Sequence, residues 1–193
     1  TGIQLSGSQD NRIINNTIVE NGLHGISLDH NSSQNNISLN SINGNNGSGI
    51  ALWNNSDGNL LEDNDLSSNQ LGISLWEGCD RNLILRNNAS ANAFSGIQIY
   101  KSMENTIAEN TAASNNYSGI ASVSSMKSRI MDNNLSQNRY GINLAGSSDD
   151  DVSGNLALSN LMQGIKVTDS VNMSLKENQL HKNRDALLIT DSQ

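Results

Sequence analysis

A glycine followed by isoleucine recurs along the whole chain at nearly constant spacing, and this repeat constrains the fold more than any other feature. The pair occurs eight times, and Ala186 with Leu187 forms a ninth, degenerate copy. Successive copies lie 22 to 24 residues apart. The glycines are Gly2, Gly25, Gly49, Gly72, Gly96, Gly119, Gly141 and Gly164. A constant period of this length is typical of a solenoid, in which each repeat stacks on the one before it.

Three asparagine positions recur inside each period, five residues apart. The middle position is occupied without exception by Asn16, Asn40, Asn64, Asn87, Asn110, Asn133, Asn155 and Asn178. The first position changes to Ser128, Asp150 and Met173 in the last three repeats. An unpartnered buried amide costs about 1–3 kcal/mol, whereas stacked amides can bond to one another along a ladder. We expect these side chains to point inward, and the asparagines themselves to take the left-handed backbone of each corner.

A serine recurs once per period as a fourth ladder, and Cys79 occupies its place in the fourth coil. We therefore interpret Cys79 as a ladder member rather than a nucleophile.

Short segments of alternating apolar residues separate the recurring asparagine and glycine positions of the repeat. An apolar residue follows the first asparagine by two positions, as in Ile13 and Ile37, and another follows the second, as in Ile18 and Ile42. Helical repeats need longer segments with a period of 3.6 residues, so this pattern predicts strands and corners. We predict an all-β, single-stranded parallel β-helix of about nine coils of 22–24 residues, spanning residues 1–193 as one domain. Each coil has three short strands, and coils are spaced by about 4.8 Å.

Composition excludes several classes of partner. The formal net charge is −8, which argues against a nucleic-acid partner because such a protein needs a basic face. No uninterrupted apolar run exceeds four residues, so we expect no membrane insertion. The histidines His24, His30 and His181 are not clustered in the sequence, and we expect neither a metal nor a cofactor.

The repeat resembles the NosD-like, or CASH-type, right-handed parallel β-helix repeats. Its clearest instance runs from Asn11 to Asn21 as Asn-Arg-Ile-Ile-Asn-Asn-Thr-Ile-Val-Glu-Asn and continues to Gly25-Ile26-Ser27-Leu28. The resemblance implies that the coils wind in a right-handed sense. It also implies a carbohydrate-binding protein or sugar hydrolase at the cell surface or outside the cell, such as the disaggregatase-type surface proteins of methanogenic archaea. The repeat residues are architectural, so they transfer the fold better than an activity.

One outward-facing column carries large aromatic rings in a chain that is only 3 % aromatic. The residue after each Gly-Ile-x-Leu segment points outward, and on three consecutive coils it is Trp53, Trp76 and Tyr100. Exposed rings suit the flat apolar faces of sugars. Polar residues in the adjoining turns complete this predicted glycan site, namely His30, Asn54 and Lys101 with the carboxylates Asp29 and Glu77. The alternatives are an aromatic ladder that only stiffens the sheet and a surface that contacts another domain of a longer chain.

Two pairs of carboxylates are candidates for catalysis. Asp29 and Glu77 lie two coils apart, about 10 Å along the axis, which leaves room for the water of an inverting glycosidase. Glu109 and Asp132 are like charges on adjacent coils, at a spacing nearer to that of a retaining enzyme. Their more ordinary interpretation is a solvated charged column.

Three functions therefore stay open at this stage. The first is a carbohydrate-binding or polysaccharide-processing module of a secreted or cell-surface protein, whose partners are a glycan and other domains of a longer chain. The second is a structural rod without a ligand, and the third is a polysaccharide hydrolase or lyase with its active site on the helix face. The first and last repeats lie close to the two ends of the sequence, so we also expect the chain to be a fragment of a longer protein.

Overall fold

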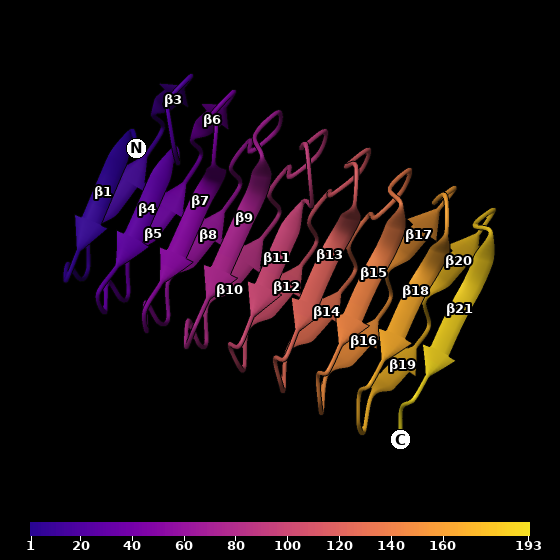
Figure 1. The fold of residues 1–193 in the computed structure, drawn as a ribbon. Coiled ribbons are helices and arrows are strands. Elements are labelled where there is room, and N and C mark those ends of the chain that lie inside the picture. The colour runs from indigo at the N-terminus through magenta and orange to yellow at the C-terminus, as the bar shows by residue number, and fades with distance from the viewer.

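The protein forms a solenoid of parallel strands, described for residues 1–193 by a computed structural model (Figure 1). One side of the solenoid is a nine-stranded parallel sheet, called here sheet A. Its strands are β1 (Ile3–Ser6), β4 (Ile26–Asp29), β7 (Ser48–Trp53), β9 (Leu71–Trp76), β11 (Ile97–Tyr100), β13 (Ser118–Val123), β15 (Tyr140–Ala145), β18 (Gln163–Thr168) and β21 (Asp185–Thr190). Each strand pairs with the equivalent strand of the next coil, residue for residue, as in Ile50↔Ile73 and Trp53↔Trp76.

A second side carries an eight-stranded parallel sheet, called here sheet B. It consists of β2 (Arg12–Ile14), β5 (Asn36–Ser38), β8 (Leu60–Glu62), β10 (Leu83–Leu85), β12 (Thr106–Ala108), β14 (Arg129–Met131), β16 (Asp151–Ser153) and β19 (Ser174–Lys176). With nine strands in one sheet and eight in the other, the chain makes eight complete turns and begins a ninth. The coil count is thus close to the predicted nine.

The third side is less regular than the sequence predicts. Paired strands form only at its two ends, as β3 (Thr17–Val19) with β6 (Ser41–Asn43) and β17 (Leu156–Leu158) with β20 (Gln179–His181). Between them the coils are joined by isolated bridges such as Asp65↔Asn88. In these coils the third of the three predicted strands is therefore reduced to a single bridging residue, such as Asp65. None of the chain forms a helix of the length and hydropathy that crossing a bilayer requires.

The core is a stack of isoleucine, leucine and valine side chains inside the coils. Both inward positions of sheet A are fully buried in the middle coils, for example Ile73 and Leu75. The repeat glycine admits no side chain because the coils approach too closely there. A Cβ on Gly49 would lie 2.8 Å from the carbonyl oxygen of Gly72 and 2.8 Å from Cδ2 of Leu66.

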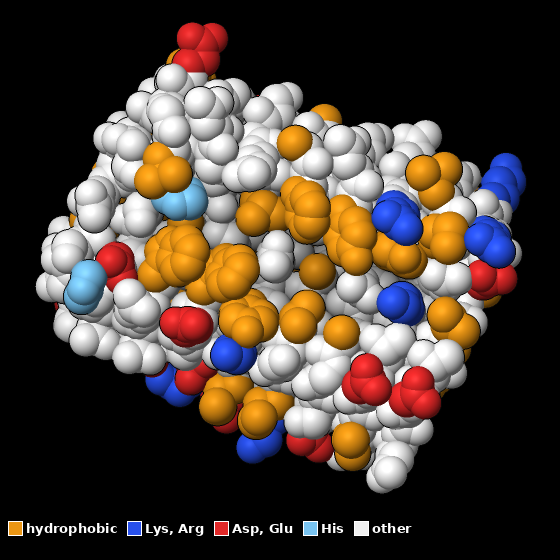
Figure 2. Space-filling model, in the orientation of Figure 1, with side chains coloured by type: hydrophobic (Ala, Val, Ile, Leu, Met, Phe, Trp, Pro, Cys, Tyr) orange, Lys and Arg blue, Asp and Glu red, His pale blue; other side chains and the backbone are white.

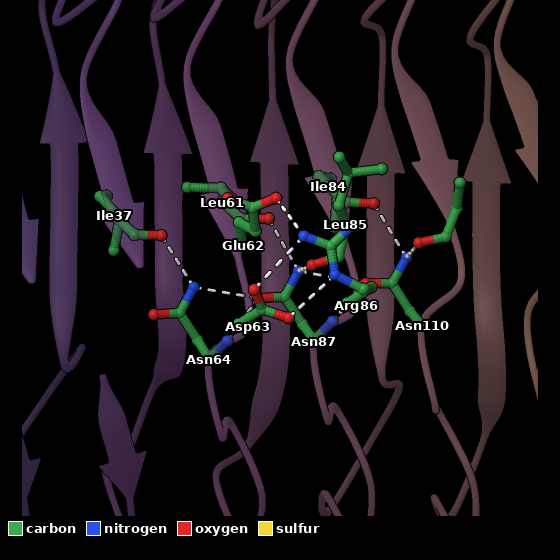
Figure 3. A network of polar contacts seen from close by, with 11 residues as sticks. Ile37, Leu61, Glu62, Asp63, Asn64, Ile84, Leu85, Arg86, Asn87 and Asn110 are labelled. Carbon is green, nitrogen blue, oxygen red and sulfur yellow. Dashed lines mark hydrogen bonds and ion pairs between the residues drawn. The ribbon is translucent and has the colours of Figure 1, made fainter. Parts of the chain in front are cut away.

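The asparagine ladders run inside the corners and bond along the stack (Figure 3). The Asn87 side chain donates through Nδ2 to Asn110 Oδ1 at 3.1 Å, and its backbone N–H donates to the same oxygen at 2.9 Å. The Nδ2 group of Asn110 also donates to the carbonyls of Ile84 and Ala108. Because each ladder amide hydrogen-bonds to the coils on both sides, a change at one position removes hydrogen-bond partners from two coils.

The left-handed residue of each corner is not the ladder asparagine, contrary to the prediction. It is the residue immediately before it, as in Asn15 at φ 58°, Leu39 at 57° and Glu109 at 57°. A positive φ at that position turns the chain so that the following amide faces inward. The ladder asparagine is thus selected for its hydrogen bonds rather than for its tolerance of a strained backbone.

Cys79 lies fully buried in the serine ladder. Its backbone N–H donates to Ser102 Oγ at 3.1 Å, and its thiol donates to the Trp76 carbonyl at 3.2 Å. Burial raises the pKa of the thiol to about 12, so the sulfur stays protonated and unreactive at neutral pH.

Candidate functional site

All six aromatic residues of the protein lie along sheet A, on the side away from the core. They form two rows of three, one at each end of the strands of sheet A. The row at the carboxyl ends is Trp53, Trp76 and Tyr100, and the row at the amino ends is Phe94, Tyr117 and Tyr140. Figure 2 shows hydrophobic side chains gathered in a band across one face of the solenoid.

The first row follows from the register of sheet A. Trp53 is paired with Trp76, and Trp76 with Tyr100, so the three side chains leave the sheet one above another. The two indole rings are stacked, with centroids 5.5 Å apart and planes inclined by 15°. Trp76 and Tyr100 are 5.0 Å apart and tilted by 52°. All three rings are half-buried, because each covers its neighbours while one side remains open.

The second row was not predicted from the sequence. Phe94 stacks on Tyr117 with centroids 5.1 Å apart, and Tyr117 meets Tyr140 edge to face at 5.4 Å. The three residues are spaced 23 apart, which is the length of one coil and could have revealed them. Phe94 and Tyr117 stand in the turns before the repeat glycines and Tyr140 is the first residue of β15, where no alternation predicts which way a side chain points.

Between the two rows lies a shallow groove whose floor carries both apolar and amide side chains. Trp76 and Phe94 line one cavity of about 270 Å³, together with Gln98 of β11. A second cavity of about 210 Å³ continues past Gln98 and is lined by Phe94, Tyr117 and Asn143. The first row spans β7 to β11 and the second row spans the turns before β11 and β13 and the start of β15. The residues that line the two cavities come from β9 to β15, so the groove crosses the coils obliquely, over three rung steps of about 4.8 Å.

A polar cluster borders the groove beside Trp53. His30 contacts Asp29 through Nδ1 and Oδ2 at 2.8 Å, and Asn54 Nδ2 donates to Asp29 Oδ1 at 2.8 Å. His24 lies with its ring centroid 6.2 Å from that of Trp53, and its Nδ1 accepts the Ser48 N–H at 3.0 Å. Burial lowers the pKa of His24, so this imidazole is neutral near pH 7 and its Nε2 carries the proton.

Glu77 and Lys101 follow the first row on successive coils. Both are exposed, and Lys101 Nζ lies 4.9 Å from the centroid of the Tyr100 ring. The neighbouring phenol of Tyr100 raises the pKa of Lys101. The structure thus brings Trp53, Trp76 and Tyr100 together with the polar residues that the sequence analysis grouped with them. These polar residues are Asp29, His30, Asn54, Glu77 and Lys101.

The two pairs of carboxylates are placed differently. The strand β7 lies between Asp29 and Glu77, and the Asp29 carboxylate is occupied by His30 and Asn54. Glu109 and Asp132 lie at a corner that follows sheet B, away from the groove. The Asp132 carboxylate lies against Gly154 of the following coil, whereas Glu109 belongs to the preceding coil. The carboxylates of the first pair are thus separated by a whole coil, and the second pair lies away from the groove.

Comparison with known proteins assigns this architecture to a family. The model of the right-handed β-helix region matches residues 72–193, well over half of the chain. The chain belongs to the right-handed β-helix family. A second model, that of the periplasmic copper-binding protein NosD, matches residues 1–95 of this β-helix. No curated protein sequence matches it.

Solved structures agree with the β-helix fold over nearly the whole chain. The A-module of the mannuronan C-5 epimerase AlgE4 from Azotobacter vinelandii superimposes with a TM-score of 0.87 and 16 % identity, covering 96 % of this chain and 57 % of that one. The periplasmic alginate epimerase AlgG gives a TM-score of 0.76 and 19 % identity, covering 92 % and 50 %. Tailspike protein 2 of the Escherichia coli O157:H7 bacteriophage CAB120 gives 0.68 and 10 %, covering 89 % and 30 %. The β-helix thus spans about half the length of the epimerases, and identities this low establish the fold alone.

The NosD match raises the question of copper, whose ligands in proteins are imidazole, thiolate and thioether groups. Residues 1–95 contain two histidines and one cysteine. Cys79 is buried in its ladder with a protonated thiol, His24 accepts a backbone N–H, and His30 contacts Asp29. No group of three or more His, Cys, Asp or Glu side chains converges in this β-helix. Its side chains therefore do not fit a copper site.

Proposed function

We propose that this β-helix is a polysaccharide-binding module and that a glycan chain lies in the groove between the two aromatic rows. The single observation that carries the proposal is the concentration of all six aromatic residues on one face of one sheet. Sugars present flat C–H faces surrounded by hydroxyl groups. Half-buried rings around a floor that carries amide side chains match both parts of that surface.

The magnitude of ring contact is sufficient for useful binding. Covering about 100 Å² of one ring face contributes roughly 2 kcal/mol before the entropic costs of association. Several rings along an extended ligand add such contributions. The floor residues Gln98 and Asn143 and the border residues His30 and Asn54 supply hydrogen-bonding groups for sugar hydroxyls.

The comparisons support a polysaccharide ligand and a location outside the cytoplasm. Two of the similar structures are alginate epimerases by name, and both AlgG and NosD are named as periplasmic proteins. We extend from these likenesses only the class of ligand and an extracellular, cell-surface or envelope location. A catalytic role for Asp29 with Glu77 would require a hydrolase or lyase activity beyond binding.

One observation favours the alternative of a ligand-free rod. The rings contact one another at 5.0 to 5.5 Å within each row, and such contacts stabilise a sheet by themselves. The alternative predicts that changing a ring alters stability without altering binding.

The test is a glycan array with the 193-residue chain, followed by titration calorimetry on each glycan that binds. Trp76 lies in the middle of the first row, so Trp76→Leu, which keeps apolar volume but removes the flat ring, should weaken binding by about 1–2 kcal/mol. Thr168→Ala, in the same column three coils beyond Tyr100, is the matched control and should bind as the parent does. Equal binding by parent and Trp76→Leu, or no glycan bound by the parent, refutes the proposal in favour of the rod.

A further inference from the structure

Two cationic side chains converge on one ring at the far end of the groove. Arg139 Cζ lies 5.4 Å from the centroid of Tyr140, and Lys166 Nζ lies 5.6 Å from the same centroid. Arg139 also lies 5.8 Å from the centroid of Tyr117. Tyr140 is only 8 % exposed, so its ring is a fixed platform, and each cation lies within 6 Å of its centre.

No carboxylate of the protein pairs with either cation. The ion pairs of the structure join Asp29, Asp57, Glu62 and Asp63 to His30, Arg81 and Arg86, all on earlier coils. Asp185, on the strand after Lys166, is held by Gln163 Nε2 at 2.6 Å. Two unpaired like charges over one ring repel each other, and an anion between them would relieve that repulsion. Such a basic end is unexpected in a protein of net charge −8.

Asn143 links this basic end to the cavity beside Tyr117, because it lines that cavity and is the strand neighbour of Lys166. It stands on β15 in register with Ala121 on one side and Lys166 on the other. Its side chain lines the 210 Å³ cavity and is 8 % exposed, and its Oδ1 has no hydrogen-bond partner. A buried amide oxygen without a partner costs about 1–3 kcal/mol in the free protein. Rotation of the amide presents either its acceptor or its donor to a ligand in the cavity.

The two aromatic rows differ in the charges beside them. Asp29, Glu77 and Lys101 lie beside the first row, whereas the charged neighbours of the second row are the cations Arg139 and Lys166. A neutral glycan would gain no electrostatic attraction from these two cations. Ala121, the small residue next to Asn143, leaves the cavity open in front of Tyr117, where a sugar ring can stack.

We propose that Asn143, Arg139 and Lys166 form a subsite for a carboxylate-bearing sugar, with the ring over Ala121, the amide of Asn143 bonding to the sugar, and the carboxylate between the two cations. Guanidinium and ammonium groups bind carboxylates through charge-assisted hydrogen bonds, which are stronger than neutral ones. The inference rests on the proposed glycan function and adds the chemical class of the ligand. It also fixes the orientation of the bound chain along the groove.

The experiment compares matched acidic and neutral ligands on the whole chain. The probes are oligosaccharides of glucuronate, galacturonate and mannuronate, each beside its carboxyl-reduced form of the same length. Titration calorimetry at low salt gives the ratio of acidic to neutral affinity. We expect the parent to prefer at least one acidic member about tenfold, a difference that added salt diminishes.

Variants assign the preference to the subsite. Lys166→Gln and Arg139→Gln should each lower the acidic-to-neutral ratio severalfold, and the isosteric Asn143→Asp should lower it further by repulsion. Lys176→Gln on sheet B makes the same change of charge away from the groove and should leave the ratio of the parent unchanged. Circular dichroism confirms that each variant is folded.

The outcomes separate this inference from the proposed function. Equal affinity for the acidic and neutral members overturns the subsite and leaves glycan binding intact. A preference that survives both Lys166→Gln and Arg139→Gln also overturns it. Binding of no probe and of no glycan on the array overturns the proposed function itself, and the subsite with it.

Discussion

Asp150 replaces an asparagine in the first ladder, and its burial should make the stability of the protein depend on pH. The side chain is 0 % exposed, and Oδ1 accepts the Ser128 N–H at 2.7 Å. The other carboxylate oxygen, Oδ2, has no hydrogen-bond partner. Burial raises the pKa of Asp150 from 3.8 to about 6, and the adjacent Asp149 adds to the rise. The informative perturbation is Asp150→Asn, which restores an uncharged ladder amide of the same shape.

The sign of the effect follows from proton linkage. Because the pKa is raised in the folded state, the folded protein holds this proton more tightly than the unfolded chain does. Stability therefore falls as the pH rises from about 4 to about 6, and the loss is complete above the folded pKa. A shift of about two pKa units corresponds to about 3 kcal/mol at neutral pH. The amide of Asp150→Asn carries no charge and escapes this loss.

The assay is urea unfolding of the parent and of Asp150→Asn at a series of pH values between 4 and 8. Other carboxylates titrate equally in both proteins, so the difference in free energy of unfolding isolates Asp150. We expect that difference to be smallest near pH 4 and to grow by about 3 kcal/mol in favour of the variant by pH 7. Asp10→Asn is the control, because Asp10 is exposed, stands in the first coil at the position equivalent to Asp149 and lies six coils from Asp150. A difference between Asp150→Asn and the parent that does not change with pH would refute the reasoning.

Two further predictions concern the ladder and the close approach of the coils, and urea unfolding measures both. Asn110→Leu should lower the free energy of unfolding by at least about 3 kcal/mol, because Asn87 and Asn133 each lose a hydrogen-bond partner. The control Asn116→Leu, at an exposed position, should cost little. Similar losses of stability for both variants would show that the ladder does not stabilise the fold. Gly49→Ala should cost about 1–3 kcal/mol because its Cβ meets backbone of the next coil. Gly22→Ala, whose Cβ meets nothing within 4 Å, should be neutral or slightly stabilising, and an equal cost at both glycines would contradict the packing argument.

Much of the architecture was predictable from the repeat because a solenoid translates sequence period directly into spatial neighbours. Residues one coil apart, such as Asn87 and Asn110, become contacts wherever the period is kept. The same rule brings Trp53, Trp76 and Tyr100 into one column, since alternation along a strand fixes which side of the sheet each faces.

The tertiary structure decided what lies where the period gives no direction. Phe94 and Tyr117 stand in turns, and only the path of those turns brings them across from the first aromatic row to line a groove. The position of the left-handed residue before each ladder asparagine likewise depends on how the corner is closed.

By itself, then, the sequence determined the β-helix, its coil length, its ladders and one row of rings, because these follow from a single translation along the axis. Only the tertiary structure decided the second row of rings, the groove, and the convergence of Arg139 and Lys166 on Tyr140. These depend on side-chain directions around the circumference of each coil. A periodic sequence specifies which residues stack, whereas the turn geometry between strands specifies which stacks face one another.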